Sequence, residues 1–292
     1  MRLISLGILL FFSALFLQPA FAKQAETIDE LAAMYSIDKC AACHEEKYNE
    51  WKTSSMGNSV IDPRVLRGWR TFIRLALDEE ASLARKDLRI CLDCHVPQIQ
   101  DGTDGLVEHI AELVLTAVEH ESPAERDAAI KELSKLNLNC LGCHNLRATG
   151  FGSQPMENTI YVPDHINGSA HEAAGYKTIQ SDYFTKSDFC ARCHHCPPSV
   201  PWEECPTLYT TYIDDFVKHG RTETCQECHM LGKQRSHKFL GPQNQDFLKS
   251  SVSLSMDARL SRYLDIYENR KLPAVVIKVR LASNAGHTIP HG

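Results

Sequence analysis

Five stretches of this chain share the pattern Cys-x-x-Cys-His. They read Cys40-Ala-Ala-Cys43-His44, Cys91-Leu-Asp-Cys94-His95, Cys140-Leu-Gly-Cys143-His144, Cys190-Ala-Arg-Cys193-His194 and Cys225-Gln-Glu-Cys228-His229. For 292 residues with 12 Cys and 14 His, chance would give about 0.02 copies. The motifs begin 51, 49, 50 and 35 residues apart, and the segments between them do not resemble one another. The motif, rather than a longer repeat, is therefore the organising feature.

Each motif has the residues that covalent attachment of haem c requires. The two sulfurs bond the vinyl groups of one haem, and the His that follows is placed to bind the iron as proximal ligand. A disulfide framework needs no His after each pair, zinc ribbons combine Cys pairs two at a time, and a redox Cys-x-x-Cys explains a single motif. The sequence therefore predicts five haem c groups, with proximal iron ligands His44, His95, His144, His194 and His229.

Residues 1–22 have the form of a secretory signal peptide. Arg2 precedes an apolar stretch from Leu3 to Leu17, and Ala20-Phe21-Ala22 is a typical cleavage site. No later segment approaches the ~20 apolar residues of a membrane helix. We expect a periplasmic or extracellular protein without a membrane span after cleavage. The net charge of −6 argues against a nucleic-acid partner.

The number of predicted cofactors sets the fold class. After signal cleavage 270 residues would remain, or 54 per haem. At that density the porphyrins must form much of the apolar core and lie near one another. We expect a mainly α multihaem cytochrome with a haem-dominated core, long loops and a small C-terminal β element.

Apolar periodicity predicts three helices. One runs from Pro123 to about Leu136 and begins with the capping-box pattern Ser122-Pro-Ala-Glu125. Another begins at Asp62-Pro63, and a further one is centred near Ile110. Their apolar stripes are Leu66, Trp69, Phe72, Ile73, Ala76 and Leu77, and Leu106, Val107, Ile110, Leu113, Val114 and Val118.

Two later segments differ from this helical pattern. Residues 153–182 carry Gly, Asn and Pro with little periodicity, which predicts a loop-rich segment. Residues 275–281 alternate as a strand does, with 252–256 as the expected partner. We therefore divide the mature chain into a pentahaem cytochrome domain, 23–245, and a C-terminal helix and β-strand segment, 246–292.

Cys196 and Cys205 are the two cysteines outside the motifs. In an oxidising compartment a local disulfide is the expected state of two such thiols. The bond would close a loop beside His194 and His195. We predict a Cys196–Cys205 disulfide.

Several stretches resemble a group of bacterial multihaem cytochromes c related to hydroxylamine oxidoreductase, pentahaem nitrite reductase and the tetrahaem cytochrome of ammonia oxidisers. The resemblance covers most of the mature chain, but its specific matches are short. They are Cys43-His44-Glu-Glu-Lys-Tyr48-Asn-Glu-Trp51, Cys190-Ala-Arg-Cys193-His194, Phe216-Val-Lys-His219-Gly220, Cys225-Gln-Glu-Cys228-His229-Met230, Ser236-His237-Lys-Phe239-Leu-Gly241 and Asn284-Ala-Gly-His287-Thr-Ile-Pro290-His-Gly292.

The resemblance implies distal iron ligands. His219, His237 and His287 match positions that bind iron on the side opposite the proximal His. His171 is implied because a His at this distance before a motif recurs in the group, and His165 is its rival. Most of the haems would then have two imidazole ligands, which lack the Met that raises the potential of small cytochromes c.

The distal ligand of the fifth haem stays open. Relatives often place a His where Gly57 stands, and the Cys-x-x-Cys-Lys site of the nitrite reductases is absent from this sequence. His109 and His120 are weaker alternatives, and Met56 has a sulfur that can bind iron. This predicts one haem that differs from bis-His ligation, or one that takes His109 or His120.

These observations predict periplasmic electron transfer, with redox proteins such as other cytochromes as partners. No catalytic residue is assigned. One alternative is an oxidoreductase in which an open-site haem acts on a small nitrogen or sulfur species. Another is a subunit of an extracellular electron conduit or cytochrome filament. The open edge of the C-terminal strand also predicts a partner chain that pairs with it.

Overall fold

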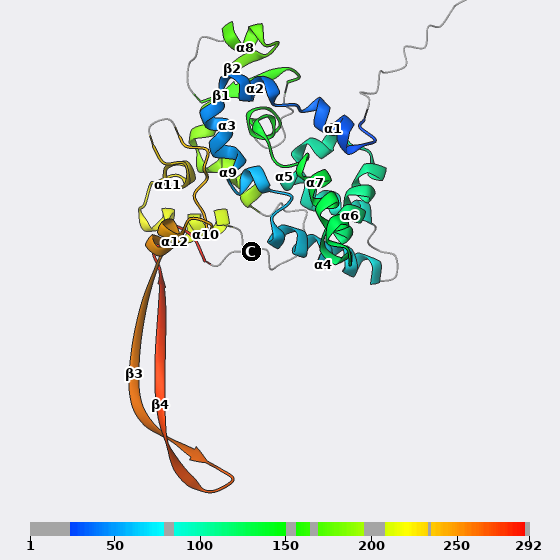
Figure 1. Ribbon diagram of the computed structural model, residues 1–292. Helices are drawn as coiled ribbons and strands as arrows, with labels where there is room; N and C mark the ends of the chain where they lie inside the picture. Colours follow the sequence, from blue (N-terminus) through cyan, green and yellow to red (C-terminus); the bar gives the residue numbers. More distant parts are fainter. Residues whose placement is uncertain are drawn as a thin grey trace, which may run out of the picture.

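The computed structural model describes residues 24–78, 85–149, 156–163, 169–195, 208–232 and 235–289. The predicted signal peptide, His165 and the predicted Cys196–Cys205 disulfide lie outside these residues. The described chain forms a helical body from which one long β-hairpin projects (Figure 1). The mainly α fold with a small C-terminal β element is thereby confirmed.

Most elements of the body are short. In chain order they are α1 (Ile28–Met34), α2 (Asp38–Cys43), α3 (Glu45–Lys52), η1 (Met56–Asn58), α4 (Pro63–Asp78), η2 (Arg85–Leu88), α5 (Arg89–His95), η3 (Pro97–Asp101), α6 (Asp104–Glu119), α7 (Pro123–Ser134), η4 (Gly142–Leu146), β1 (Thr159–Val162), α8 (Ser169–Ala173), β2 (Lys177–Gln180), η5 (Asp182–Thr185), α9 (Ser187–His194), α10 (Leu208–Asp215), η6 (Val217–His219), α11 (Cys225–His229) and α12 (Gln245–Ser251). Within the described ranges, no helix combines the length and apolar character that crossing a membrane requires.

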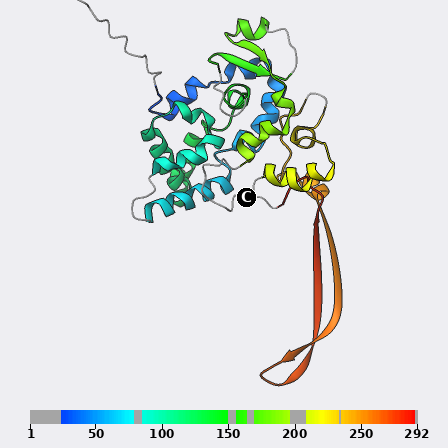
Figure 2. The same cartoon turned by 180° about the vertical axis from the view of Figure 1, so that it is seen from behind.

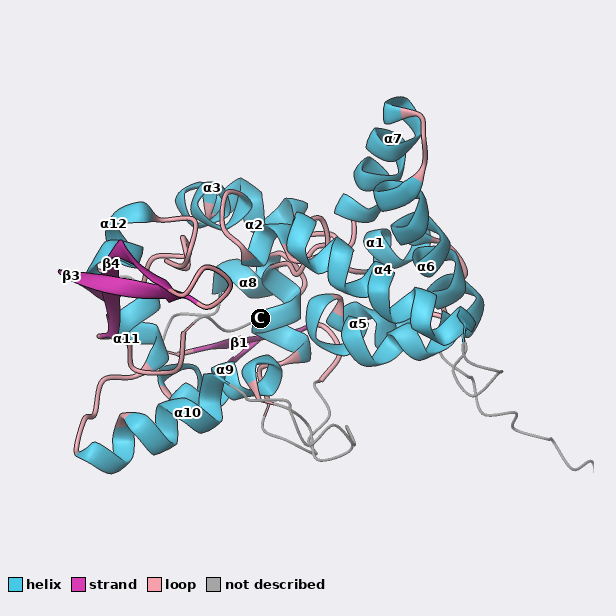
Figure 3. Cartoon of the chain, turned by 90° about the horizontal axis from the view of Figure 1, so that it is seen from below, coloured by secondary structure: helices cyan, strands magenta, loops and turns pink. Residues whose placement is uncertain are grey.

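The largest apolar core lies where α6 packs against α4 and α7, at one end of the body (Figure 3). Thr103 begins α6 by accepting a hydrogen bond from the N–H of Leu106. The predicted stripe of α6 faces this core, and α4 contributes Leu66, Trp69, Phe72 and Ile73 of its own predicted stripe. The fully or nearly buried members are Leu66, Trp69, Ile73, Leu106, Val107, Ile110 and Val114.

Helix α7 starts as predicted, but its capping box does not form. Ser122 is the N-cap and Pro123 the first helical residue, yet the Ser122 side chain makes no capping hydrogen bond. The backbone N–H of Ser122, which Glu125 would have to engage in a capping box, donates instead to Nδ1 of His120 at 3.2 Å. The start of the helix is therefore favoured by Pro123, whose ring fixes the backbone angle φ near its helical value, and not by a capping hydrogen bond of Ser122.

The segment predicted to be loop-rich contains regular structure. β1 and β2 form a parallel pair that places Thr159 beside Lys177, and α8 lies between them in the chain. All four residues of β1, Thr-Ile-Tyr-Val, are buried. A strand buried on both faces lacks the alternation that identifies strands in a sequence, and this explains the wrong prediction.

The hairpin consists of β3 (Val252–Asp265) and β4 (Arg270–Ser283) in antiparallel pairing. The predicted partnership of 252–256 with the alternating segment 275–281 is confirmed, since Leu254 pairs with Leu281 and Met256 with Val279. Both strands are much longer than predicted. Figures 1 and 2 show the hairpin leaving the body beside α12 and extending away from it.

Candidate haem-binding sites

The motif cysteines lie on helical turns that bring sulfurs of different motifs together. Cys40 lies within hydrogen-bonding reach of Cys140, and contact with that thiol lowers the pKa of Cys40 to about 7. Contact with the thiol of Cys190 likewise lowers the pKa of Cys225 to about 7. The first motif is therefore next to the third, and the fourth next to the fifth.

The second motif completes this arrangement. The thiol of Cys94 points to the carbonyl of Arg192 at 4.0 Å, and that of Cys193 points to the carbonyl of Cys94 at 3.8 Å. Cys143 is close enough to act electrostatically on Cys190 and Cys193. The fourth motif thus has the second, third and fifth as neighbours, and all five attachment sites form one connected group.

Three motif histidines face a second histidine from elsewhere in the chain. The rings of His44 and His171 are nearly parallel, with centroids 5.8 Å apart and planes 21° from parallel. The centroids of His144 and His237 are 6.3 Å apart, and those of His229 and His287 are 6.1 Å apart, each with planes 16° from parallel. His171, His237 and His287 are three of the four distal positions that the family resemblance implied.

The spacing of these ring pairs fits a metal ion between two imidazoles. With metal–nitrogen bonds of about 2 Å and about 1 Å from nitrogen to ring centre, two axial imidazoles have centroids about 6 Å apart. In the described part of the chain, no three His, Cys, Asp or Glu side chains gather as a metal cluster. The histidine rings instead occur in pairs, and a haem iron has two axial positions for such ligands.

Backbone carbonyls fix the orientation of the motif histidines. Nδ1 of His95 lies 2.8 Å from the carbonyl oxygen of Ser59, and Nδ1 of His144 lies 2.9 Å from that of Tyr161. His229 makes the same contact with Leu240 at 2.5 Å. An Nδ1–H held in this way leaves Nε2 as the metal-binding nitrogen, the usual arrangement of histidine ligands.

Burial keeps these imidazoles neutral. It lowers the pKa of His95, His144 and His229, and it lowers the pKa of His237 to about 4. A neutral imidazole retains the lone pair that metal binding needs. The electrostatics therefore favour iron ligation over protonation at neutral pH.

The loop carrying His237 is held by the helix that follows the first motif. Glu50 of α3 accepts hydrogen bonds from the backbone N–H of His237 and from the hydroxyl of Ser236, each at 2.9 Å. In the pair formed by His44 and His171, Nδ1 of His171 is buried and makes no hydrogen bond to any described residue. A bound metal would satisfy such an atom.

The remaining sequence candidates lie elsewhere. His109, His120 and His219 are exposed. The ring contact of His95 is with Trp69, edge to face at 5.2 Å between centroids. Met56 is half-buried in η1, three residues before Ser59, whose carbonyl holds the Nδ1 side of His95.

Gly57 is required by close packing. A Cβ atom at this position would lie 2.2 Å from the carbonyl oxygen of Trp51, well inside van der Waals contact. A His, which the family resemblance implied for this position, has no room in this turn.

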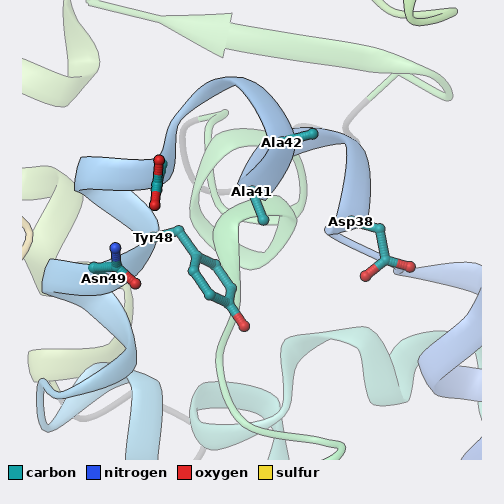
Figure 4. Close-up of a pocket in the computed structure, with 6 residues that line it drawn as sticks. Asp38, Ala41, Ala42, Tyr48 and Asn49 are labelled. Carbon is teal, nitrogen blue, oxygen red and sulfur yellow. The ribbon is translucent and has the colours of Figure 1, made fainter.

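An open cavity of about 450 Å³ adjoins the first motif (Figure 4). Ala41 and Ala42, the residues between Cys40 and Cys43, form part of its wall, and Tyr48 extends beneath Ala41. The two small side chains between the cysteines thus leave this part of the motif's surface open. The other lining residues are Asp38, Glu45 and Asn49.

Ser59 links segments of the chain that carry different motifs. Its hydroxyl donates to the carbonyl of His95 at 3.0 Å and accepts from the N–H of Leu138 at 2.7 Å. Trp51 donates its indole N–H to the Leu138 carbonyl at 2.8 Å. Ser59 thus joins the segments that carry the first three motifs, and no motif signals this role in the sequence.

Comparison with known proteins agrees with the site. Residues 39–123, which include the first two motifs, match the family described as cytochrome c554 and c-prime. No curated protein and no solved structure matches the chain. The family match supports a multihaem c-type cytochrome, a class that binds haem c covalently and transfers electrons.

Proposed function

We propose that this protein is an exported electron carrier that binds five haem c groups and works in the periplasm or outside the cell. The ten motif cysteines would hold the haems, and His44, His95, His144, His194 and His229 would be the proximal ligands. When bound, haem c supplies one-electron oxidation and reduction of its iron.

The observation that carries the proposal is the set of three histidine pairs whose nearly parallel rings have the centroid spacing of two axial ligands. We assign His171, His237 and His287 as distal ligands opposite His44, His144 and His229. Two histidine ligands favour a low potential and fill both axial positions, so such sites transfer electrons without binding substrate. The contacts among motif sulfurs support transfer between all five sites, with the fourth motif at the branch point.

The proposal is tested by replacing distal histidines one at a time with Met, for example His237→Met. A Met ligand raises the potential, so redox titration should show one haem moving to higher potential. His109→Met is the matched control, because His109 is exposed and contacts no motif histidine ring. Identical titrations of His237→Met and the unmodified protein would refute the assignment.

A second candidate function is an oxidoreductase with an open-site haem at the second motif. This candidate is favoured by the surroundings of His95. Its ring contacts Trp69, whereas the rings of His44, His144 and His229 each face a second histidine. Cyanide or nitric oxide added to the ferric protein should then convert one high-spin signal to low spin. Absence of any high-spin signal in the electron paramagnetic resonance spectrum would exclude this candidate.

A further inference from the structure

We refer to the hairpin, residues 252–283, as the arm. Paired residues of an antiparallel ribbon point to the same face, so the register separates its two faces. On one face four successive pairs are wholly apolar: Leu254 with Leu281, Met256 with Val279, Ala258 with Ile277, and Leu260 with Val275. The opposite face carries Ser255 with Arg280, Asp257 with Lys278, Arg259 with Val276, and Ser261 with Ala274.

The body does not cover the apolar face. Leu260 is 92% exposed and Ile277 is 58% exposed, and the six other residues of the four pairs are exposed as well. The arm meets the body through α12 at its root and then extends away from it (Figure 2). A two-stranded ribbon is marginally stable by itself in water, and an apolar face of this size indicates an interaction surface.

We propose that the apolar face of the arm packs against the same face of a second copy of this chain, with the two arms antiparallel about a two-fold axis. A face free of charge over four pairs is complementary to itself, which a two-fold interface requires. Two such ribbons stacked about 10 Å apart would form a small β-sandwich. This inference does not depend on how the haems are ligated.

Charge favours a second copy as the occupant. The arm contains six of the chain's 31 basic residues and three of its 37 acidic residues, a net charge of +3, which leaves −9 on the rest of the chain. Antiparallel stacking places the tip of each arm at the root of the other. The distal half of the arm, with Arg262, Arg270 and Lys271 outnumbering Asp265 and Glu268, would therefore lie against the acidic body of its partner.

The register that buries all four apolar pairs makes a specific contact. It is centred near residue 257, and it places Arg262 opposite the root pair Val252 and Ser283 of the partner subunit. Lys271 pairs with Leu264, which is the next pair toward the tip on the same face. In this register Lys271 would reach α12 of the partner subunit. Asp246 lies on that helix with its side chain 98% exposed.

The area of the face indicates a reversible dimer. In this register residues 252–262 of β3 overlap, and eleven residues at about 3.3 Å each with a width near 10 Å give roughly 360 Å² per arm, or about 720 Å² in total. That area is in the range of weak, transient interfaces. Pairing through the edge of β4 is disfavoured because Pro273 lacks the N–H that a further strand would need.

Sedimentation of the haem-loaded exported protein at several concentrations tests the inference. We expect a monomer–dimer equilibrium in the micromolar range. Ile277→Lys should weaken the dimer at least about tenfold, because it buries a charge in the apolar face. Val276→Lys is the matched control, since Val276 is adjacent, 56% exposed and on the opposite face; it should leave the dimer unchanged.

A charge exchange tests the register. Lys271→Glu should weaken the dimer about two- to fivefold, and Asp246→Lys in the same chain should restore it. A monomer throughout the micromolar range, equal effects of Ile277→Lys and Val276→Lys, or failure of the charge exchange to restore association would overturn the proposal. So would species larger than a dimer, or a monomer that binds phosphatidylglycerol vesicles through Ile277, which would identify a lipid surface as the occupant.

Discussion

At the scale of single residues, the haem-binding sites depend on backbone groups held by a few polar side chains. Ser59 is the clearest case, because one hydroxyl serves both the His95 carbonyl and the N–H of Leu138. Ser59 itself is nearly buried. Removing the hydroxyl would leave two polar backbone groups without partners next to a proximal ligand.

Ser59→Ala should therefore destabilise the haem-loaded protein by about 1–3 kcal/mol, the cost of leaving such groups unsatisfied. The midpoint of urea unfolding measures this change. Ser55→Ala is the control, because the Ser55 side chain caps no helix and lies in the same turn. Equal midpoints for the two variants would show that the Ser59 hydroxyl does not join the motif-bearing segments.

Gly57 gives a second prediction at this scale. Gly57→Ala places a Cβ 2.2 Å from the Trp51 carbonyl oxygen, so it should lower the unfolding midpoint and shift the signal of the haem at the second motif. Gly68→Ala on α4 is the control, since a Cβ there meets nothing within 4 Å; it should be neutral or stabilising by up to about 1 kcal/mol. A Gly57→Ala protein as stable as the Gly68→Ala protein would contradict this packing.

At the scale of elements, α4 and α6 are joined by an apolar interface and by one carboxylate. Glu119 of α6 accepts hydrogen bonds from Arg74 and from Nε of Arg70, the latter at 2.5 Å. The guanidinium groups, Arg74 first, lower the pKa of Glu119 from its ordinary 4.5 to about 2. The charged form of this carboxyl group is therefore favoured by folding.

The sign of the pH effect follows from that depressed pKa. The contribution of Glu119 to stability is complete above about pH 4.5 and is lost as the pH falls toward 2. Glu119→Gln should therefore reduce stability near neutral pH and flatten the fall in thermal midpoint between these pH values. An unchanged acid profile in Glu119→Gln would mean that the carboxylate does not stabilise the contact between α4 and α6.

The same elements show what the sequence could predict. Periodic stripes identified α4 and α6 because each helix buries one face, whereas β1 was missed because it is buried on both. The Cys-x-x-Cys-His motifs are local and were found directly. The distal partners came only through family resemblance, because His171, His237 and His287 stand 127, 93 and 58 residues from the motif histidines that they face. Spacing in the sequence carries no information about such pairs.

At the scale of the whole molecule, one body joins five attachment sites and one arm extends from it. The sulfurs of Cys94, Cys193, Cys190 and Cys225 link three motifs in succession, and Cys40 and Cys140 link the other two. A connected group of sites suits transfer between partners at different surfaces of the body. The arm would bring a second copy of the body into the same assembly.

The number of haems tests this account most directly. The measurement is the intact mass of the exported, haem-loaded protein after extraction with acidified acetone, which removes haem that is not covalently bound. We expect the mass of polypeptide 23–292 plus five haem groups. A mass corresponding to four haems or fewer would contradict it.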